Sequence, residues 1–199
     1  MQHRYEIGRI GRVQVQISSL KSGPPNGRYY DPAPLREVEW LEMNHDGVTA
    51  IVDGEHVVDV HNATHPATKN RDGINPISIG FTSHYDRMRE RFDGHLVNGI
   101  AGESILVETD TPVELDIVAG GFTIECADGR SIDLVDVSVA HPCVEFSRFA
   151  LNDRAAPPLV VSEALRFLDN GLRGYYATVQ STEPVRVEPG DRVFAIRQR

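Results

Sequence analysis

Short stretches of alternating apolar and polar residues, separated by Asp-Gly pairs, are the feature that most limits how this chain can fold. Between residues 13 and 17, valine and isoleucine alternate with glutamine. A period of two is typical of a half-buried strand. Asp-Gly favours positive φ, so the pairs at 53–54 and 128–129 predict two tight hairpins. The pattern therefore indicates a chain built mainly of short strands.

Two short helices are expected beside the strands. Ser83 is expected to cap the first helix, with Asp86 returning the bond three residues later. The second is expected from about Ser162, with leucines at 165, 168 and 172 as its buried stripe. The predicted strands are residues 13–17, 48–52, 56–60, 76–82, 105–108, 122–126, 132–134, 175–181 and 193–196. We expect a mostly β fold with short helices, a β-barrel-like single domain over residues 1–199.

Composition narrows the classes of partner. The net charge is -9, from 20 basic and 29 acidic residues, which argues against nucleic acid as the main partner. No apolar run is long enough to span a bilayer, so we expect no membrane partner. The first residues, Met1 to Glu6, lack the apolar core of a signal peptide. We therefore expect the protein in the cytoplasm.

Cys143 is the leading candidate for chemistry. It follows a valine-rich run, within His141-Pro142-Cys143, where Pro142 favours an extended residue before it. A thiolate is a strong nucleophile and a soft metal ligand, and His141 beside it favours the anion. The alternative is a thiol packed as a small apolar side chain. Cys126, by contrast, shares strand phase with core residues, so we expect it to be structural.

A turn-rich segment carries two histidines and two cations. His61 and His65 precede Lys69 and Arg71. The functional interpretation is a loop facing a substrate or phosphate, with the two cations supplying positive charge. Zinc binding by the histidines is a second interpretation, and solvated histidines are a third.

Two glycine-containing motifs complete the candidates. Gly102-Glu103-Ser104 stands directly before a predicted strand, where glycine allows a ligand to approach the backbone. Arg173 lies between two glycines, where its guanidinium either binds an anion or is solvated.

The order of these motifs resembles the MOSC family, named for the C-terminal domain of molybdenum cofactor sulfurase. The resemblance runs from about Gly11 to about Ile196, and its best single match is Pro142-Cys143. It implies a barrel similar to the pyruvate kinase β-barrel domain. It also implies that Cys143 either carries sulfur as a persulfide or ligates molybdenum, with His141 beside it.

The resemblance implies molybdenum cofactor (molybdopterin) as the ligand. The family usually has asparagine where Ser104 stands. The implied cofactor-binding residues, several of them cationic as a pterin phosphate requires, are Lys69, Arg71, Gly102, Glu103, Ser104, Arg148 and Arg173.

The resemblance leaves two functions open. One is molybdenum-cofactor-dependent redox chemistry or sulfur transfer on a small-molecule substrate. The other is non-catalytic delivery of sulfur or cofactor to a partner enzyme. A partner sulfurtransferase or reductase is expected in either case, and pyridoxal phosphate would enter only through such a partner.

Overall fold

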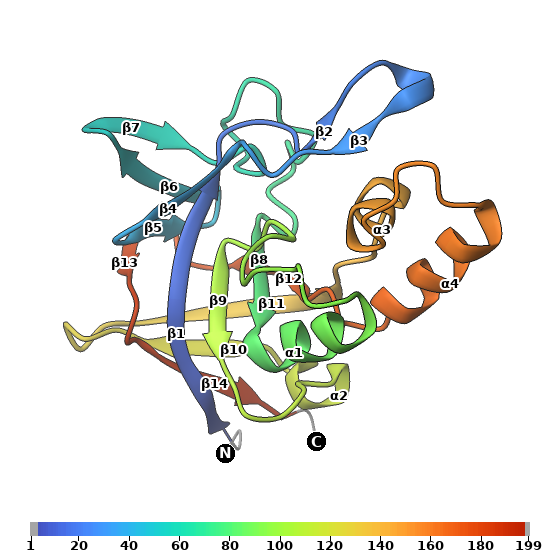
Figure 1. Ribbon diagram of the computed structural model, residues 1–199. Coiled ribbons are helices and arrows are strands. Elements are labelled where there is room, and N and C mark those ends of the chain that lie inside the picture. Colours follow the sequence, from blue (N-terminus) through green and yellow to red (C-terminus); the bar gives the residue numbers. More distant parts are fainter. Residues whose placement is uncertain (1–3, 198–199) are drawn as a thin grey trace.

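Strand β1 (Arg4–Gln16) forms one wall of the protein and pairs with three other strands (Figure 1). The computed structural model describes residues 4–197, so residues 1–3 and 198–199 of the predicted domain lie outside the described part. The strands that follow β1 around the ring are β14 (Arg192–Ile196), β10 (Phe122–Glu125), β11 (Ser131–Val139), β12 (Tyr175–Val179), β8 (Ile77–Phe81) and β9 (Ile105–Glu108). Since β9 pairs again with β1, the ring closes into a seven-stranded barrel, which confirms the predicted fold class. Only the β8–β9 pair in this ring is parallel.

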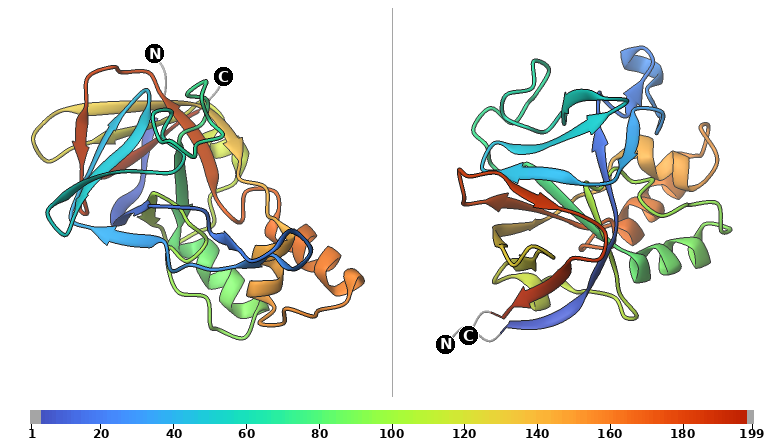
Figure 2. Two further views of the ribbon diagram at one scale, coloured as in Figure 1. Left: turned by 90° about the horizontal axis from the view of Figure 1, so that it is seen from above. Right: turned by 90° about the vertical axis from the view of Figure 1, so that its left-hand side faces the viewer.

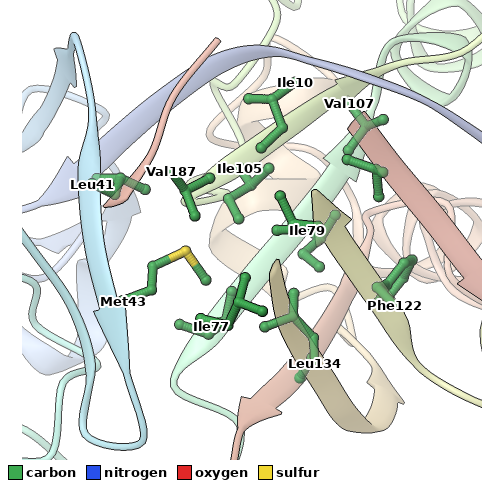
Figure 3. Close-up of a cluster of buried hydrophobic side chains, with 14 of the residues drawn as sticks. Ile10, Leu41, Met43, Ile77, Ile79, Ile105, Val107, Phe122, Leu134 and Val187 are labelled. Carbon is green, nitrogen blue, oxygen red and sulfur yellow. The ribbon is translucent and has the colours of Figure 1, made fainter. Parts of the chain in front are cut away.

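A second sheet packs on the barrel and shares its core. Its strands, in sheet order, are β13 (Val185–Val187), β5 (Leu41–Asn44), β6 (Gly47–Val52) and β7 (Glu55–Val58). Figure 3 shows Leu41, Met43 and Val187 of this sheet beside Ile77 and Ile105 of the barrel. All five side chains are fully buried, and each such side chain contributes about 1.5–3 kcal/mol by leaving water. The two sheets therefore fold around one apolar interior.

The helices gather on one side of the barrel, and a small hairpin approaches them (Figures 1 and 2). A second apolar cluster fills the space between, with Tyr30, Tyr85 and Phe146 among its members. The elements on this side are α1 (Thr82–Arg91), α2 (Leu115–Val118), α3 (Val144–Ala150), α4 (Pro158–Leu168), and the hairpin β2 (Lys21–Ser22) and β3 (Tyr29–Tyr30) with the 3-10 turn Pro25–Gly27; β4 (Leu35–Val38) extends the sheet beyond β1. Within residues 4–197, no helix has both the length and the apolar character needed to cross a membrane.

Both Asp-Gly hairpins are present, and the first has positive φ at Asp53 and Gly54. The predicted Ser83 cap is wrong, however, and the second helix starts earlier than expected. Helix α1 begins at Thr82, and the Ser83 hydroxyl bonds to Thr109 and to a carbonyl rather than to its own helix. Helix α4 begins at Pro158 because proline suits the first helical position, where no N–H is needed. Helix α3, which no local sequence pattern predicted, is the element that positions Cys143.

The polar face predicted for β1 is also corrected. Gln14 and Gln16 were expected on the outer face of a half-buried strand, yet they are only 1% and 7% exposed. That face of β1 packs against the loop before β9, where the Gln14 amide donates to two backbone carbonyls, and the Gln16 amide donates to the Ser18 carbonyl just after β1. Buried amides of this kind need such partners, and Gln14 thereby holds the loop in place.

Candidate functional site

Cys143 is the N-cap residue of α3 and is half-buried. Pro142 precedes it, and the backbone of Cys143 is extended, with φ -112 and ψ 162. The Phe146 N–H donates to Sγ at 3.5 Å, and the Ser147 hydroxyl donates to the Cys143 carbonyl at 3.0 Å. The sulfur therefore takes the place of the side-chain oxygen that usually accepts this bond at a helix start. A short helix fixes the thiol without sealing it in the core.

Arg173 connects the cysteine segment to the loop before β9. Its Nη2 donates to the Ala101 carbonyl at 2.6 Å, and its Nη1 donates to the His141 carbonyl at 3.5 Å. The guanidinium also lies 5.1 Å from the centre of the Phe146 ring. Its buried Nε has no hydrogen-bond partner among the described residues. The side chain thus holds two segments together and keeps one donor free.

The charge on Arg173 is secure despite burial. Burial alone would lower its pKa, but nearby acidic groups, with Tyr176 and Tyr30 foremost, outweigh burial and raise it. Cys143 is among the groups that interact electrostatically with this guanidinium. Arg173 therefore supplies permanent positive charge beside the thiol.

The loop at Gly102 is fixed from several sides. Gln14 donates to the carbonyls of Gly99 and Glu103, both at 2.7 Å, and the Tyr30 hydroxyl donates to the Ile100 carbonyl at 2.7 Å. Gly102 has φ +95, and a Cβ there would lie 2.7 Å from a Leu20 methyl group. Only glycine adopts that conformation without strain.

A buried carboxyl lies under this loop. The Tyr85 hydroxyl donates to Glu103 at 2.8 and 3.0 Å and accepts a bond from the Ala101 N–H at 2.9 Å. Burial raises the pKa of Glu103, although its own N–H, Tyr85 and Arg173 oppose that rise. A Cβ on Gly80 would lie 2.7 Å from the carboxyl, so the pocket fits this side chain closely. Glu103 serves as an internal anchor of the loop.

Several of these groups surround a small cleft of about 40 Å³, which the Cys143 thiol itself does not line. Gly102, Glu103 and Arg173 line it, together with His61 and Tyr176. A cavity of this size admits one or a few atoms rather than a ring system. The structure therefore brings together three of the residues predicted to bind cofactor, while Ser104 is buried behind them against Ser78.

The other predicted residues lie elsewhere. Lys69 and Arg71 are exposed and do not line the cleft, and Arg148 lines a different cavity with Tyr29 and Tyr30. His141 is exposed, and its Nδ1 lies 2.8 Å from an Asp169 carboxylate oxygen. This bond and the Asn170 N–H lower the pKa of Asp169.

The two histidines considered for zinc are engaged in their own turns. His61 Nδ1 lies 3.0 Å from the buried Asp59 carboxylate, and His65 Nδ1 accepts the Ala67 N–H at 3.1 Å. Across the part of the chain that the structure describes, no three His, Cys, Asp or Glu side chains gather as a metal site.

Several residues of the site escaped sequence reasoning. Tyr30 and Tyr85 come from a hairpin and a helix far apart in the chain, and Asp169 follows α4. Their hydroxyl and carboxyl groups meet the site only through tertiary packing. The one signal available was the pair of glutamines within a valine-rich strand, since buried amides indicate a polar partner.

Two crystal structures resemble the protein over most of its length. The YuaD protein from Bacillus subtilis has a TM-score of 0.63 and 14% identity, with 100% of each chain covered. YiiM from Geobacillus stearothermophilus has a TM-score of 0.51 and 12% identity, covering 99% of this chain and 76% of that one. Both are MOSC-domain-type proteins, so the likeness shows a MOSC-like fold. No protein-family model matches the chain, and no curated protein matches its sequence.

Proposed function

We propose that Cys143 is the reactive sulfur of a protein acting in molybdenum-cofactor-dependent redox chemistry or sulfur transfer. The observation that carries the proposal is a half-buried thiol beside a guanidinium whose buried Nε has no hydrogen-bond partner among residues 4–197. The MOSC-like fold agrees with it. A thiol serving only as core packing would need neither the cation nor the open side.

The residues present fit the metal end of molybdenum cofactor. Cys143 offers a soft thiolate ligand, and Arg173 offers positive charge and a free donor. The cleft beside Gly102 has room for atoms bound to a metal but not for the pterin ring. When bound, the cofactor would supply two-electron redox chemistry at molybdenum.

The chain's own residues would act by orientation and charge. Helix α3 fixes the sulfur through the Phe146 N–H, and Arg173 supplies a permanent positive charge beside it. His141 is held by Asp169 through Nδ1, and its Nε2 makes no hydrogen bond within residues 4–197. Glu103 and Tyr85 keep the loop at Gly102 in register with Arg173.

Sulfur carriage on Cys143 is the second candidate. The Arg173 guanidinium supports this function as well as it supports the redox one, because both need positive charge beside the sulfur. In that reaction the Cys143 thiolate attacks the outer sulfur of a partner's persulfide. A new S–S bond forms on Cys143, and the partner thiolate leaves, so no external oxidant is needed. The partner would be a sulfurtransferase, with any pyridoxal phosphate on the partner. A reductase would be the partner in the redox alternative, and the cytoplasm would keep the thiol reduced.

The test compares two cysteine variants of protein from a host that makes molybdenum cofactor. Molybdenum, pterin fluorescence and cyanide-releasable sulfur are measured on wild type, Cys143→Ser and Cys126→Ser. We expect molybdenum with pterin, or releasable sulfur, in wild type and in Cys126→Ser, and loss in Cys143→Ser. Molybdenum supports the cofactor role, and sulfur without molybdenum supports carriage. Absence of all three from fresh wild type, or their retention in Cys143→Ser, contradicts the proposal.

A further inference from the structure

A second and much larger cavity lies between the β2–β3 hairpin and α3. Figures 1 and 2 show the hairpin reaching over toward α3 and the segment after it, and β3 packs against α3. The cavity has a volume of about 650 Å³. Pockets that hold small molecules fall in the range of about 300–1,000 Å³. It is large enough for a ligand with a ring, which the cleft at Arg173 is not.

Three arginines line this cavity, and none has a carboxylate partner within residues 4–197. Arg28 and Arg154 are exposed, and the partly buried Arg148 has an Nε that is buried without any hydrogen-bond partner. The Arg154 guanidinium lies 4.0 Å from the centre of the Tyr29 ring, which orients it without using its N–H donors. Three free guanidiniums in one hollow of an acidic protein indicate an anionic ligand.

The carboxylates on the same walls are already engaged. Glu145 pairs with Lys21 at 3.2 Å. Asp31 accepts the Ala33 N–H at 3.0 Å, and Asp153 accepts the Ala155 N–H at 2.8 Å. Glu145 therefore joins α3 to the hairpin, the two aspartates stabilise their own turns, and the arginine donors stay available to a ligand.

The cavity also has an aromatic wall. Tyr30 and Phe149 line it, with their ring centres 5.1 Å apart, and Tyr29 lies beside them. Aromatic faces of this kind bind flat rings by stacking. The combination suits a ligand that joins a ring to an oxyanion.

We propose that this cavity binds a small molecule in which a flat ring carries a phosphate or a carboxylate. Arg148 and Arg28 hold the oxyanion, and the half-buried Phe149 and Tyr29 contact the ring. The cavity adjoins the Cys143 segment because Glu145, two residues after the cysteine on α3, is one of its walls. The proposal does not depend on what Cys143 carries, since the thiol itself lines neither hollow.

Calorimetric titration of the purified full chain tests the proposal. The probes are phenyl phosphate, benzoate and inorganic phosphate. We expect phenyl phosphate or benzoate to bind more tightly than inorganic phosphate, with affinity falling as salt is added. Whichever of the two ring compounds binds better identifies the oxyanion.

Matched arginine variants locate the binding. Arg148→Gln should weaken binding about tenfold or more. Arg166→Gln should leave it unchanged, because that arginine is exposed on α4 outside the cavity. Arg28→Gln, on the exposed hairpin, gives a second reading if Arg148→Gln alters the circular dichroism of the fold. Cys143→Ser should bind as wild type does.

Four results overturn the proposal. The first is that neither ring compound binds saturably up to about 10 mM, and the second is that Arg148→Gln and Arg166→Gln weaken binding equally. The third is loss of binding in Cys143→Ser, and the fourth is displacement of bound molybdenum cofactor by the probe. The last two would assign the anion to the thiol site instead. Failure of the cysteine experiment above would leave this test unaffected.

Discussion

Removing a single hydroxyl, in Tyr85→Phe, should destabilise the protein by an amount that the local contacts determine. The Tyr85 hydroxyl is fully buried, donates to Glu103 and accepts the Ala101 N–H. Phenylalanine keeps the ring packed in the second apolar cluster. The variant therefore isolates the hydrogen bonds from the packing.

The expected loss is about 3 kcal/mol. An unpaired buried donor or acceptor costs about 1–3 kcal/mol, and the variant leaves two such groups, the Glu103 carboxyl and the Ala101 N–H. In a chain of this size the melting temperature should fall by about 6–12 °C. The Tyr85 bond also lowers the pKa of Glu103, so its loss raises that pKa further above the unfolded value. When an acidic group has a higher pKa in the folded protein than in the unfolded chain, the folded protein loses stability as pH rises, because the unfolded chain deprotonates first. Raising that pKa further should therefore make the defect larger at pH 8 than at pH 5.

Urea unfolding at the two pH values measures this effect. Tyr5→Phe is the control, because that exposed hydroxyl makes a 3.4 Å bond to the Ile117 carbonyl. Pairing Tyr85→Phe with Glu103→Gln in a double-mutant cycle gives the coupling between the two side chains. A Tyr85→Phe variant within about 0.5 kcal/mol of wild type at both pH values would refute the claim that this bond anchors the loop.

Two other substitutions have defined outcomes. Burial lowers the pKa of His84 to about 4. Between about pH 6.5 and 4 the unfolded chain therefore binds a proton at this histidine while the folded protein does not. Acidification over that range should lower the free energy of unfolding by about 3 kcal/mol. His84→Gln should flatten that slope in pH-dependent urea unfolding, and the exposed His45→Gln should not; equal slopes in all three proteins would rule out the assignment. Gly174→Ala should lower the free energy of unfolding by about 3 kcal/mol or more, because φ is +107 and a Cβ would lie 2.3 Å from the Ile79 carbonyl oxygen. Gly190→Ala has a similar φ, +98, but open space around the Cβ, so it should lower the free energy of unfolding by about 1 kcal/mol. Thermal melts that show equal losses for the two glycines would remove the steric part of the argument.

Local patterns in the sequence predicted the β-barrel because strand alternation and Asp-Gly turns act over a few residues. Helix α3 escaped prediction because it has seven residues, and a helix so short is stabilised by tertiary packing of Phe146 rather than by a periodic stripe. The proposed start of α1 failed for a related reason. Ser83 bonds across to the segment after β9, a contact that no local pattern contains.

The candidate site was predictable only in part. Gly102, Glu103 and Arg173 were found from glycine spacing and lie around one cleft. Charge alone was a weaker guide, since Arg148 lies in a different cavity and the loop cations lie outside both. Which cation faces which hollow depends on how the β2–β3 hairpin packs against α3, and that packing is a long-range property.

The pairing of β1 with β14, which closes the barrel, constrains the order in which the protein folds during synthesis. Arg4 pairs with Ile196, so the first and last strands of the ring are hydrogen-bonded neighbours. During synthesis at about 5–20 residues per second, the β10–β11 hairpin can pair early, but the ring stays open until β14 leaves the ribosome. Contacts between residues so far apart in the sequence slow folding. Until β14 pairs with β1 and β10, each of these two strands presents an unpaired edge to other chains. A nascent chain that stalls before β14 is therefore the species most exposed to aggregation, and chaperones that cover strand edges would act at that stage.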